Sequence, residues 1–305
     1  MRQNLPDDTQ FPRLSMDVIH TVAWMKQVAE GARTTGRILG LVPTMGALHE
    51  GHLSLVREAR KQCSPVVVSI FVNPKQFGPS EDFQKYPRSL EADRAALEKL
   101  GVDYLFVPPP EEMYPPGFGT SVVVEGLGDR LEGRSRPGHF RGVTTVVLKL
   151  FEIVQPRFSF FGRKDAQQVR IIRQMAFDLN LYPEIVVCPI VREPDGLALS
   201  SRNAYLKNGE RRAATVLYRA LELFRREILS GQRSAAPLVA SMRQLIESEP
   251  GVSLDYAEIV DAGTFEPVMA CRKACYALVA ARVGATRLID NALIEQAGDS
   301  FTVTL

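Results

Sequence analysis

The chain has 305 residues, which is long for a single hydrophobic core, so two domains are expected. Its composition, 45% hydrophobic and 24% charged, is typical of a soluble globular protein. A formal net charge of +2 provides no overall field for nucleic acid or an anionic membrane, and no apolar run reaches the roughly 18 residues of a membrane span. Residues 1–15 lack a signal-peptide core and are expected to be a loose extension. The four cysteines form no Cys-x-x-Cys pair, so a cytoplasmic protein with reduced thiols is predicted.

The first predicted elements are a helix, a strand and a second helix. Apolar residues at helical spacing predict a helix over 17–32, and a short apolar run predicts a strand over 38–42. The segment 43–52 follows, with the sequence Pro-Thr-Met-Gly-Ala-Leu-His-Glu-Gly-His, and a helix is predicted over 51–62. The order is therefore strand, glycine-bearing turn and helix N-terminus.

This turn carries the strongest functional signal in the chain. A helix N-terminus has unpaired N–H groups and a partial positive charge, which attract anions. Gly46 and Gly51 leave room for a phosphate, and His49 and His52 share one helix face, where an imidazolium would add charge and donors. The spacing does not fit the zinc motif His-Glu-x-x-His, and no Gly-Lys-Ser/Thr of a Walker loop follows. The pattern favours nucleotide binding.

A second polar segment follows the next predicted strand. Residues 65–72 form a nearly continuous apolar run, which is typical of a central parallel strand buried on both faces. Asn73 and Gln76 come directly after it, and ligands of open parallel sheets lie beyond the carboxyl ends of the strands. Their uncharged amides suit a hydroxyl and a carboxylate of a substrate, and a plain turn at Asn73 is the competing interpretation.

Helices and strands continue to alternate, which predicts a parallel sheet. Helices are predicted over 90–100 and 144–153, and strands over 102–107, 121–124, 158–161 and 184–191. The segment 130–142 is rich in arginine and glycine and is expected to be a mobile basic loop. Arginine holds phosphates through paired donors, although a solvated charge run explains such a segment equally well.

Two further polar segments follow the last two predicted strands of this sheet. In the first, Lys164 stands at the N-terminus of a helix that ends near residue 179, where it can neutralise a phosphate, and Gln168 lies one turn on, on the same face. In the second, Ser200, Ser201 and Arg202 offer several donors to the oxygens of a triphosphate.

The character of the sequence changes near residue 190. Amphipathic helices are predicted over 210–229 and 235–248, followed by strands over 254–260, 275–283 and 286–293, the last at a sheet edge. The predicted fold class is therefore α/β. A Rossmann-like parallel-sheet domain spans 1–190, and a smaller α+β domain that covers the site as a lid spans 191–305.

Several of these segments together resemble one family. The segment 43–52 resembles the His-x-x-His motif of the nucleotidyltransferase superfamily and, as a whole decapeptide, the pantothenate synthetase (pantoate–β-alanine ligase) family. The resemblance spans roughly residues 16–295 and includes 73–88, 136–143, 162–168 and 199–203. The chain departs from the family pattern at Arg163, where glutamate is usual, at Ala166, where a large residue is usual, and at Leu199, where methionine is usual.

The resemblance implies an ATP-dependent ligase that condenses (R)-pantoate with β-alanine through a pantoyl adenylate and releases AMP and pyrophosphate. It implies small-molecule substrates, Mg²⁺ accompanying ATP, and a homodimer formed through the first domain. The implied catalytic residues are His52, His49 and Lys164, and no metal ligands are assigned. The implied ATP site comprises Met45, Gly46, Ala47, Leu48, His49, Glu50, Gly51, His52, Gly162, Arg163, Lys164, Asp165, Val191, Leu199, Ser200, Ser201 and Arg202.

The resemblance also implies where the other substrates lie. Asn73, Gln76 and Gln168 would hold pantoate or β-alanine, and Arg136 and His139 would close over the adenylate. Two other functions fit part of the pattern. A nucleotidyltransferase that stops after nucleotide transfer would share the histidine and serine–arginine segments. A nucleotide-sensing regulatory protein without turnover would be consistent with the departures from the family pattern.

Overall fold

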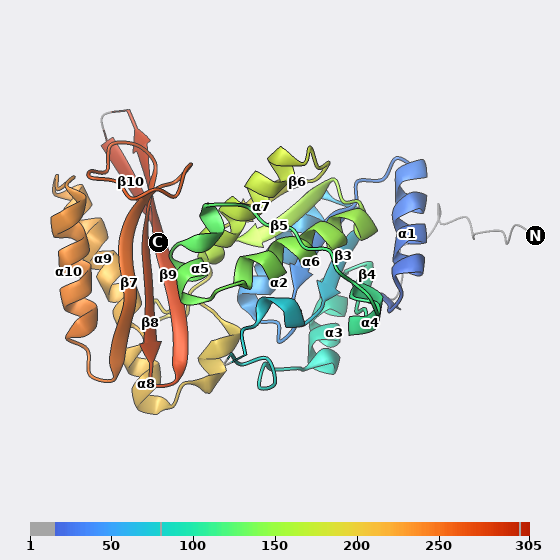
Figure 1. Ribbon diagram of the computed structural model, residues 1–305, viewed down its shortest axis with the longest axis horizontal. Helices are drawn as coiled ribbons and strands as arrows, with labels where there is room; N and C mark the ends of the chain where they lie inside the picture. The colour runs from blue at the N-terminus through green and yellow to red at the C-terminus, as the bar shows by residue number, and fades with distance from the viewer. Residues whose placement is uncertain (1–15, 80, 299) are drawn as a thin grey trace, which may run out of the picture.

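The computed structural model describes residues 16–79, 81–298 and 300–305, so the extension predicted over 1–15 lies outside the described residues. Two sheets organise the chain (Figure 1). The first is parallel and six-stranded, and the second is antiparallel and four-stranded. This arrangement confirms the predicted α/β class. The domain boundary predicted at 190/191 falls between the two sheets and stays a prediction. Among the described residues, no helix is both long and apolar enough to cross a bilayer.

The parallel sheet has the strand order β1-β4-β3-β2-β5-β6. The chain runs outward from β2 to β3 and β4 and then returns to the other side of β2 to add β5 and β6. Such a reversal opens a crevice beyond the carboxyl ends of the central strands, where ligands of α/β sheets bind. The strands are β1 (Asp17–Ile19), β2 (Gly40–Thr44), β3 (Val66–Ile70), β4 (Tyr104–Phe106), β5 (Phe158–Gly162) and β6 (Glu184–Cys188).

Helices cover both faces of this sheet. On β2, Leu41 packs into the cluster built by α1, α6 and α7, whereas Val42 packs into the cluster built by α2 and α3. All five residues of β3 are buried, which confirms the predicted central strand. The helices are α1 (Val22–Thr34), α2 (Glu50–Gln62), α3 (Leu90–Lys99), α4 (Pro110–Met113), α5 (Glu132–Ser135), α6 (His139–Val154) and α7 (Ala166–Asp178).

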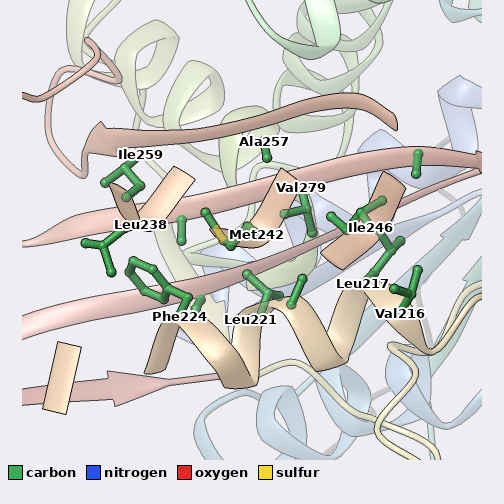
Figure 2. Packing of buried hydrophobic residues seen from close by; sticks show 14 of the residues in the cluster. Val216, Leu217, Leu221, Phe224, Leu238, Met242, Ile246, Ala257, Ile259 and Val279 are labelled. Carbon is green, nitrogen blue, oxygen red and sulfur yellow. The ribbon is translucent and has the colours of Figure 1, made fainter. Parts of the chain in front are cut away.

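The antiparallel sheet carries its helices on one face. Phe224 of α9 and Met242 of α10 belong to the same buried cluster as Val279 of β8, which Figure 2 shows at close range. The order is β10-β9-β8-β7. The elements are α8 (Asn208–Ala213), α9 (Val216–Leu229), α10 (Ala235–Glu247), β7 (Val252–Asp261), β8 (Cys275–Val283), β9 (Thr286–Ala297) and β10 (Ser300–Thr304).

The other face of this sheet is docked on the parallel-sheet part of the molecule. Leu278 and Ala280 of β8, which alternate with the residues facing the helices, pack with Leu131 and Ala166. The small side chain of Ala166 is thus buried in this junction. The docking brings β9 close to the carboxyl ends of the parallel strands (Figure 1).

Several predicted boundaries in the first domain were wrong. The helix predicted over 17–32 is split, because Asp17–Ile19 pairs with β4 and the Thr21 hydroxyl accepts the Trp24 N–H at 3.3 Å as the N-cap of α1. No strand forms over 121–124, where the backbone of Val122 is bonded instead to threonine hydroxyls of α6. The segment 130–142, predicted to be a mobile loop, folds into α5 and the first turn of α6.

In the remainder of the chain, β6 ends at Cys188, before the predicted end at 191. The helix predicted over 210–229 is two helices, α8 and α9. The strand β9 is not an edge strand, because β10, which the sequence analysis did not predict, pairs with it. A strand that gains a partner from a later segment cannot be recognised as interior from its own residues.

Candidate active site

A cleft lies at the carboxyl ends of β2, β3 and β5 and beyond β6, at the reversal of the strand order. It adjoins a second hollow that faces β9, and the two share Lys164, Gln168 and Arg202. Most of the predicted site residues line this cleft, namely Met45, His49, Gly51, His52, Gln76, Arg136, His139, Gly162, Lys164, Asp165, Gln168, Val191, Leu199, Ser200, Ser201 and Arg202. Their individual roles stay predictions.

The histidine pair is held by the start of α2. His49 is the N-cap, and its Nδ1 accepts the N–H of Gly51 at 3.2 Å, while Nδ1 of His52 accepts the N–H of His49 at 3.4 Å. The ring centroids are 4.1 Å apart. Because each Nδ1 is an acceptor, these contacts assign the proton of each neutral ring to Nε2. A Cβ on Gly51 would lie 2.9 Å from the His49 ring, so glycine is required beside it.

Both rings are uncharged at neutral pH. Burial lowers the pKa of His49 to about 4, and the nearby Lys164 charge lowers it further. Burial also lowers the pKa of His52 to about 3, helped by His49 and Lys164. The charged imidazolium rings expected from the sequence are therefore not found in this structure. The pair instead offers two neutral N–H donors.

Part of the turn before α2 faces away from the cleft. The backbone N–H groups of Ala47 and Leu48 donate to the two carboxylate oxygens of Asp93, each at 2.8 Å. Glu50 points away and forms an ion pair with Arg57. Gly46, Ala47, Leu48 and Glu50 are not among the residues that line the cleft, and their predicted ATP contacts stay predictions. Asp93 was missed because its carboxylate looks like an ordinary acidic residue in the first turn of a helix.

The amide of Gln76, which follows β3 in the 3₁₀ helix η1 (Pro74–Gln76), is oriented by a chain of hydrogen bonds. The Tyr114 hydroxyl donates to Oδ1 of Asn73 at 2.8 Å, and Nδ2 of Asn73 donates to Oε1 of Gln76 at 3.0 Å. Nε2 of Gln76 is then directed to the cleft beside the Met45 sulfur, at 3.1 Å. Asn73 is 1% exposed and is not among the residues that line the cleft, so its observed contact is with Gln76, and its predicted contact with a substrate stays a prediction.

The first turn of α6 packs closely against η1. A Cβ on Gly142 would lie 2.2 Å from the carbonyl oxygen of Lys75, so only glycine permits this approach. His139 bonds the Gln76 carbonyl oxygen through Nδ1 at 2.9 Å, and Nε2 accepts from Arg136 at 3.1 Å. Burial and the Arg136 charge lower the pKa of His139 to about 4, so this ring is also neutral. The ring therefore bridges the Arg136 guanidinium and the backbone carbonyl of Gln76.

Lys164 lies in the 3₁₀ helix η3 (Arg163–Asp165), which follows β5. Its backbone is held from the antiparallel sheet, because Nδ2 of the fully buried Asn291 on β9 donates to the carbonyl oxygens of Arg163 and Lys164, each at 2.9 Å. The Arg163 side chain points away from the cleft and bonds the carbonyl oxygens of Thr304 and Leu305. The side chain of Arg163 therefore does not line the cleft, and its predicted ATP contact stays a prediction. Asn291 was missed because nothing in its own strand marks it.

The serine–arginine segment begins the 3₁₀ helix η4 (Ser201–Tyr205). The Ser201 hydroxyl donates to the Ala47 carbonyl at 3.2 Å, which ties this segment to the turn before α2. Arg202 donates through Nε and Nη2 to both carboxylate oxygens of Asp82, each at 2.9 Å. Arg136 likewise makes a two-pronged ion pair with Glu81, at 2.8 and 2.7 Å. Arg202, predicted to bind ATP, and Arg136, predicted to close over the adenylate, are thus both held by neighbouring carboxylates.

The arrangement combines neutral donors, a lysine, two arginines and oriented amides around one cleft. Such a set can bind a polyphosphate beside a small hydroxy acid. Among the described residues, no group of three or more histidine, cysteine, aspartate or glutamate side chains is placed to hold a metal ion.

Sequence comparisons identify relatives across most of the chain. The sequence profile of the pantoate–beta-alanine ligase family matches residues 17–293. The chain is 53% identical over 285 residues to a pantothenate synthetase of Koribacter versatilis, covering 93% of this chain and 98% of the relative. It is 53% identical over 279 residues to a pantothenate synthetase of Thermotoga neapolitana, covering 92% and 100%.

Solved structures give the same result. A pantothenate synthetase structure from Thermus thermophilus superposes with a TM-score of 0.87 at 47% identity, covering 90% of this chain and 98% of that one. A pantoate–beta-alanine ligase structure from Francisella tularensis, complexed with beta-gamma ATP and beta-alanine, gives a TM-score of 0.76 at 35% identity, covering 91% and 97%. The sequence match, the fold and the cleft agree, and the chain belongs to the pantoate–beta-alanine ligase family.

Proposed function

We propose that this protein is an ATP-dependent ligase that joins pantoate to β-alanine and releases pantothenate, AMP and pyrophosphate. The observation that carries the proposal is one cleft with two kinds of lining. His49, His52, Lys164 and Arg202 supply groups for a triphosphate, and the oriented amide of Gln76 faces the same space. A nucleotide-binding site alone would not require that amide.

The first step activates an acid. A pantoate carboxylate oxygen attacks the α-phosphorus of ATP, the bond from that phosphorus to the bridging oxygen breaks, and pyrophosphate leaves. The product is a mixed anhydride, pantoyl adenylate. Enzymes accelerate phosphoryl chemistry mainly by aligning the reactants and stabilising phosphate charge. The Nε2–H groups of His49 and His52 and the Lys164 ammonium supply donors for this purpose.

The second step forms the amide. The neutral amine of β-alanine attacks the acyl carbon, the carbon–oxygen bond to AMP breaks, and the nitrogen loses a proton. AMP is a good leaving group, whereas a free carboxylate has none. Gln76 and Gln168 are proposed to hold pantoate through its hydroxyls and carboxylate during both steps. Arg136, next to His139, is proposed to contact the adenylate.

Three further features belong to the proposal. Mg²⁺ arrives with the triphosphate as part of the substrate. The protein works in the cytoplasm, consistent with the four cysteines, all free and buried. It forms a homodimer through the first domain, where Phe177 and Tyr182 expose 80% and 70% of their surface. Sedimentation equilibrium tests the dimer directly.

The deciding experiment is a turnover assay with ATP, Mg²⁺, pantoate and β-alanine, in which AMP and pantothenate are quantified. A ligase yields them in equal amounts and needs all three organic substrates. A nucleotidyltransferase would release pyrophosphate when given ATP and pantoate, and it would form no AMP after β-alanine is added. A sensor without turnover would bind ATP and form neither AMP nor pantothenate. The nucleotidyltransferase result and the sensor result would each overturn the proposal.

A further inference from the structure

We propose that Asp93 is a positioning residue for the histidine pair. Its carboxylate binds the turn that leads into α2 and so fixes where His49 and His52 lie. The side chain comes from α3, which contributes no residue to the lining of the cleft. Asp93 is 3% exposed, and its two oxygens accept the N–H groups of Ala47 and Leu48 at 2.8 Å each.

The backbone of this turn explains why a carboxylate is needed. Gly46 and Ala47 both have left-handed conformations, with φ of 81° and 49°. Left-handed backbone is unfavourable for alanine, and a turn of this kind directs successive N–H groups into one concave anion-binding site. In many proteins a ligand phosphate occupies such a site. Here a protein carboxylate occupies it and compensates for the strained backbone.

The same contact determines where a triphosphate can dock. Because Asp93 places negative charge in the turn, phosphate oxygens are excluded from it and are directed to the Nε2–H groups of the histidines. The Ala47 carbonyl also accepts the Ser201 hydroxyl at 3.2 Å, so the turn fixed by Asp93 supports the serine–arginine segment as well. One buried carboxylate therefore connects two parts of the ATP site without touching the ligand.

The first test is Asp93→Asn. The amide retains one acceptor oxygen and places an NH₂ against a backbone N–H, so one of the two contacts is lost. Displacing catalytic groups by about 1 Å can cost about 10²-fold in rate, and we expect a loss of about that size in kcat/KM for ATP. The matched control is Asp103→Asn. Asp103 also accepts a backbone N–H, from Val66 at 2.8 Å, but at the opposite end of β3, so kcat/KM should stay within about twofold.

A double-mutant cycle separates positioning from general damage to the fold. If Asp93 acts through the histidines, Asp93→Asn should reduce ATP affinity, measured by calorimetry, by a smaller factor in a His52→Ala background than in the wild-type background. Two outcomes would overturn the proposal. One is a loss of ATP affinity from Asp93→Asn that is equally large in both backgrounds, and the other is an Asp93→Asn enzyme whose kcat/KM for ATP stays within threefold of wild type. Should Asp93→Asn fail to fold, Ser89→Ala replaces it, because the Ser89 hydroxyl donates to Oδ1 of Asp93 at 3.2 Å. Ser89→Ala should give a smaller loss of ATP affinity, and this loss should again be reduced in the His52→Ala background. A loss of the same size in both backgrounds would overturn the proposal.

This inference rests on the proposed function only for its rate measurements. If the wild-type enzyme binds ATP but forms no AMP, the proposed function fails, and the calorimetric cycle still tests Asp93. If the wild type is an active ligase and the two substitutions are additive, only the role of Asp93 fails.

Discussion

Two walls of the cleft supply hydrogen-bond donors in different ways. On one wall, His49 and His52 are neutral, and each ring is held by a backbone N–H within the first turn of α2. On the other wall, Arg136 and Arg202 are charged, and each is held by both oxygens of a neighbouring carboxylate. The histidine wall keeps its geometry without any competing anion. Under the proposed function, the arginine wall would exchange a carboxylate for a phosphate.

The difference bears on how much each wall contributes to catalysis. Donors that are already in place stabilise developing charge without reorganisation, so their loss is expressed fully in the rate. An arginine that leaves a carboxylate to bind a phosphate contributes only the difference between two similar interactions. The histidine wall should therefore dominate the rate, and the arginine wall should mainly adjust ATP affinity.

The largest effect is expected for His52→Ala. It removes one preorganised donor and should lower kcat by about 10²–10³-fold. The control is His20→Ala, because His20 is exposed and its ring contacts only the Val107 carbonyl in the hydrogen bonds described. Steady-state kinetics of AMP formation measures both. If kcat of the His52→Ala enzyme stayed within threefold of wild type, the histidine wall would not dominate the rate.

A smaller effect is expected for Arg202→Ala. A charge-assisted donor is worth about 1.5–3 kcal/mol, but Arg202 must leave Asp82 to bind a phosphate, so KM for ATP should rise by less than about 10-fold, with a lesser change in kcat. Arg211→Ala is the matched control. Arg211 is paired with Asp195 and has the same side-chain exposure as Arg202, 27%, but lies outside the cleft. An equal loss in both variants would point to stability as the cause.

Asp82→Asn should act in the opposite direction. Without the competing carboxylate, Arg202 is free to bind phosphate, and ATP affinity should increase by up to about fivefold, since ion pairs this exposed are worth about 0.2–1 kcal/mol. Asp195→Asn should leave ATP affinity unchanged. Calorimetric titration with ATP distinguishes the two. Weaker binding by the Asp82 variant would mean that the ion pair holds Arg202 in its binding geometry.

The last expectation concerns the pH dependence of stability and not the rate or the ATP affinity. The folded-state pKa values of His49 and His52 are about 4 and about 3, below the ordinary value of 6.5. At a pH between the folded-state and ordinary values, the unfolded chain therefore binds more protons than the folded chain. Stability should therefore fall as pH decreases from 6.5, and His52→Gln should make this slope shallower. The Arg202 guanidinium, opposing burial, lowers the pKa of Asp82, so that ion pair contributes stability that is lost only below about pH 4. Urea unfolding at a series of pH values measures both. If the dependence of stability on pH were unchanged in His52→Gln, the lowered pKa of His52 would be contradicted.

The sequence could predict the sheet and the cluster of polar residues at its carboxyl edge. Strand periodicity is local, and the ends of consecutive parallel strands must meet, so Gln76, Lys164 and Ser200 could be placed together from their positions after predicted strands. The family resemblance supplied the expected reaction. Contacts across the two domains were not predictable in this way.

Only the tertiary structure decided the electrostatic state and the supports of the site. The histidines are neutral because the folded chain buries them beside Lys164, and burial is a property of the whole packing. Asp93 reaches Ala47 across 46 residues, and Asn291 reaches Lys164 across 127. A hydrogen bond between such distant residues depends on where the fold places two backbones, whereas sequence patterns report only what neighbouring residues favour.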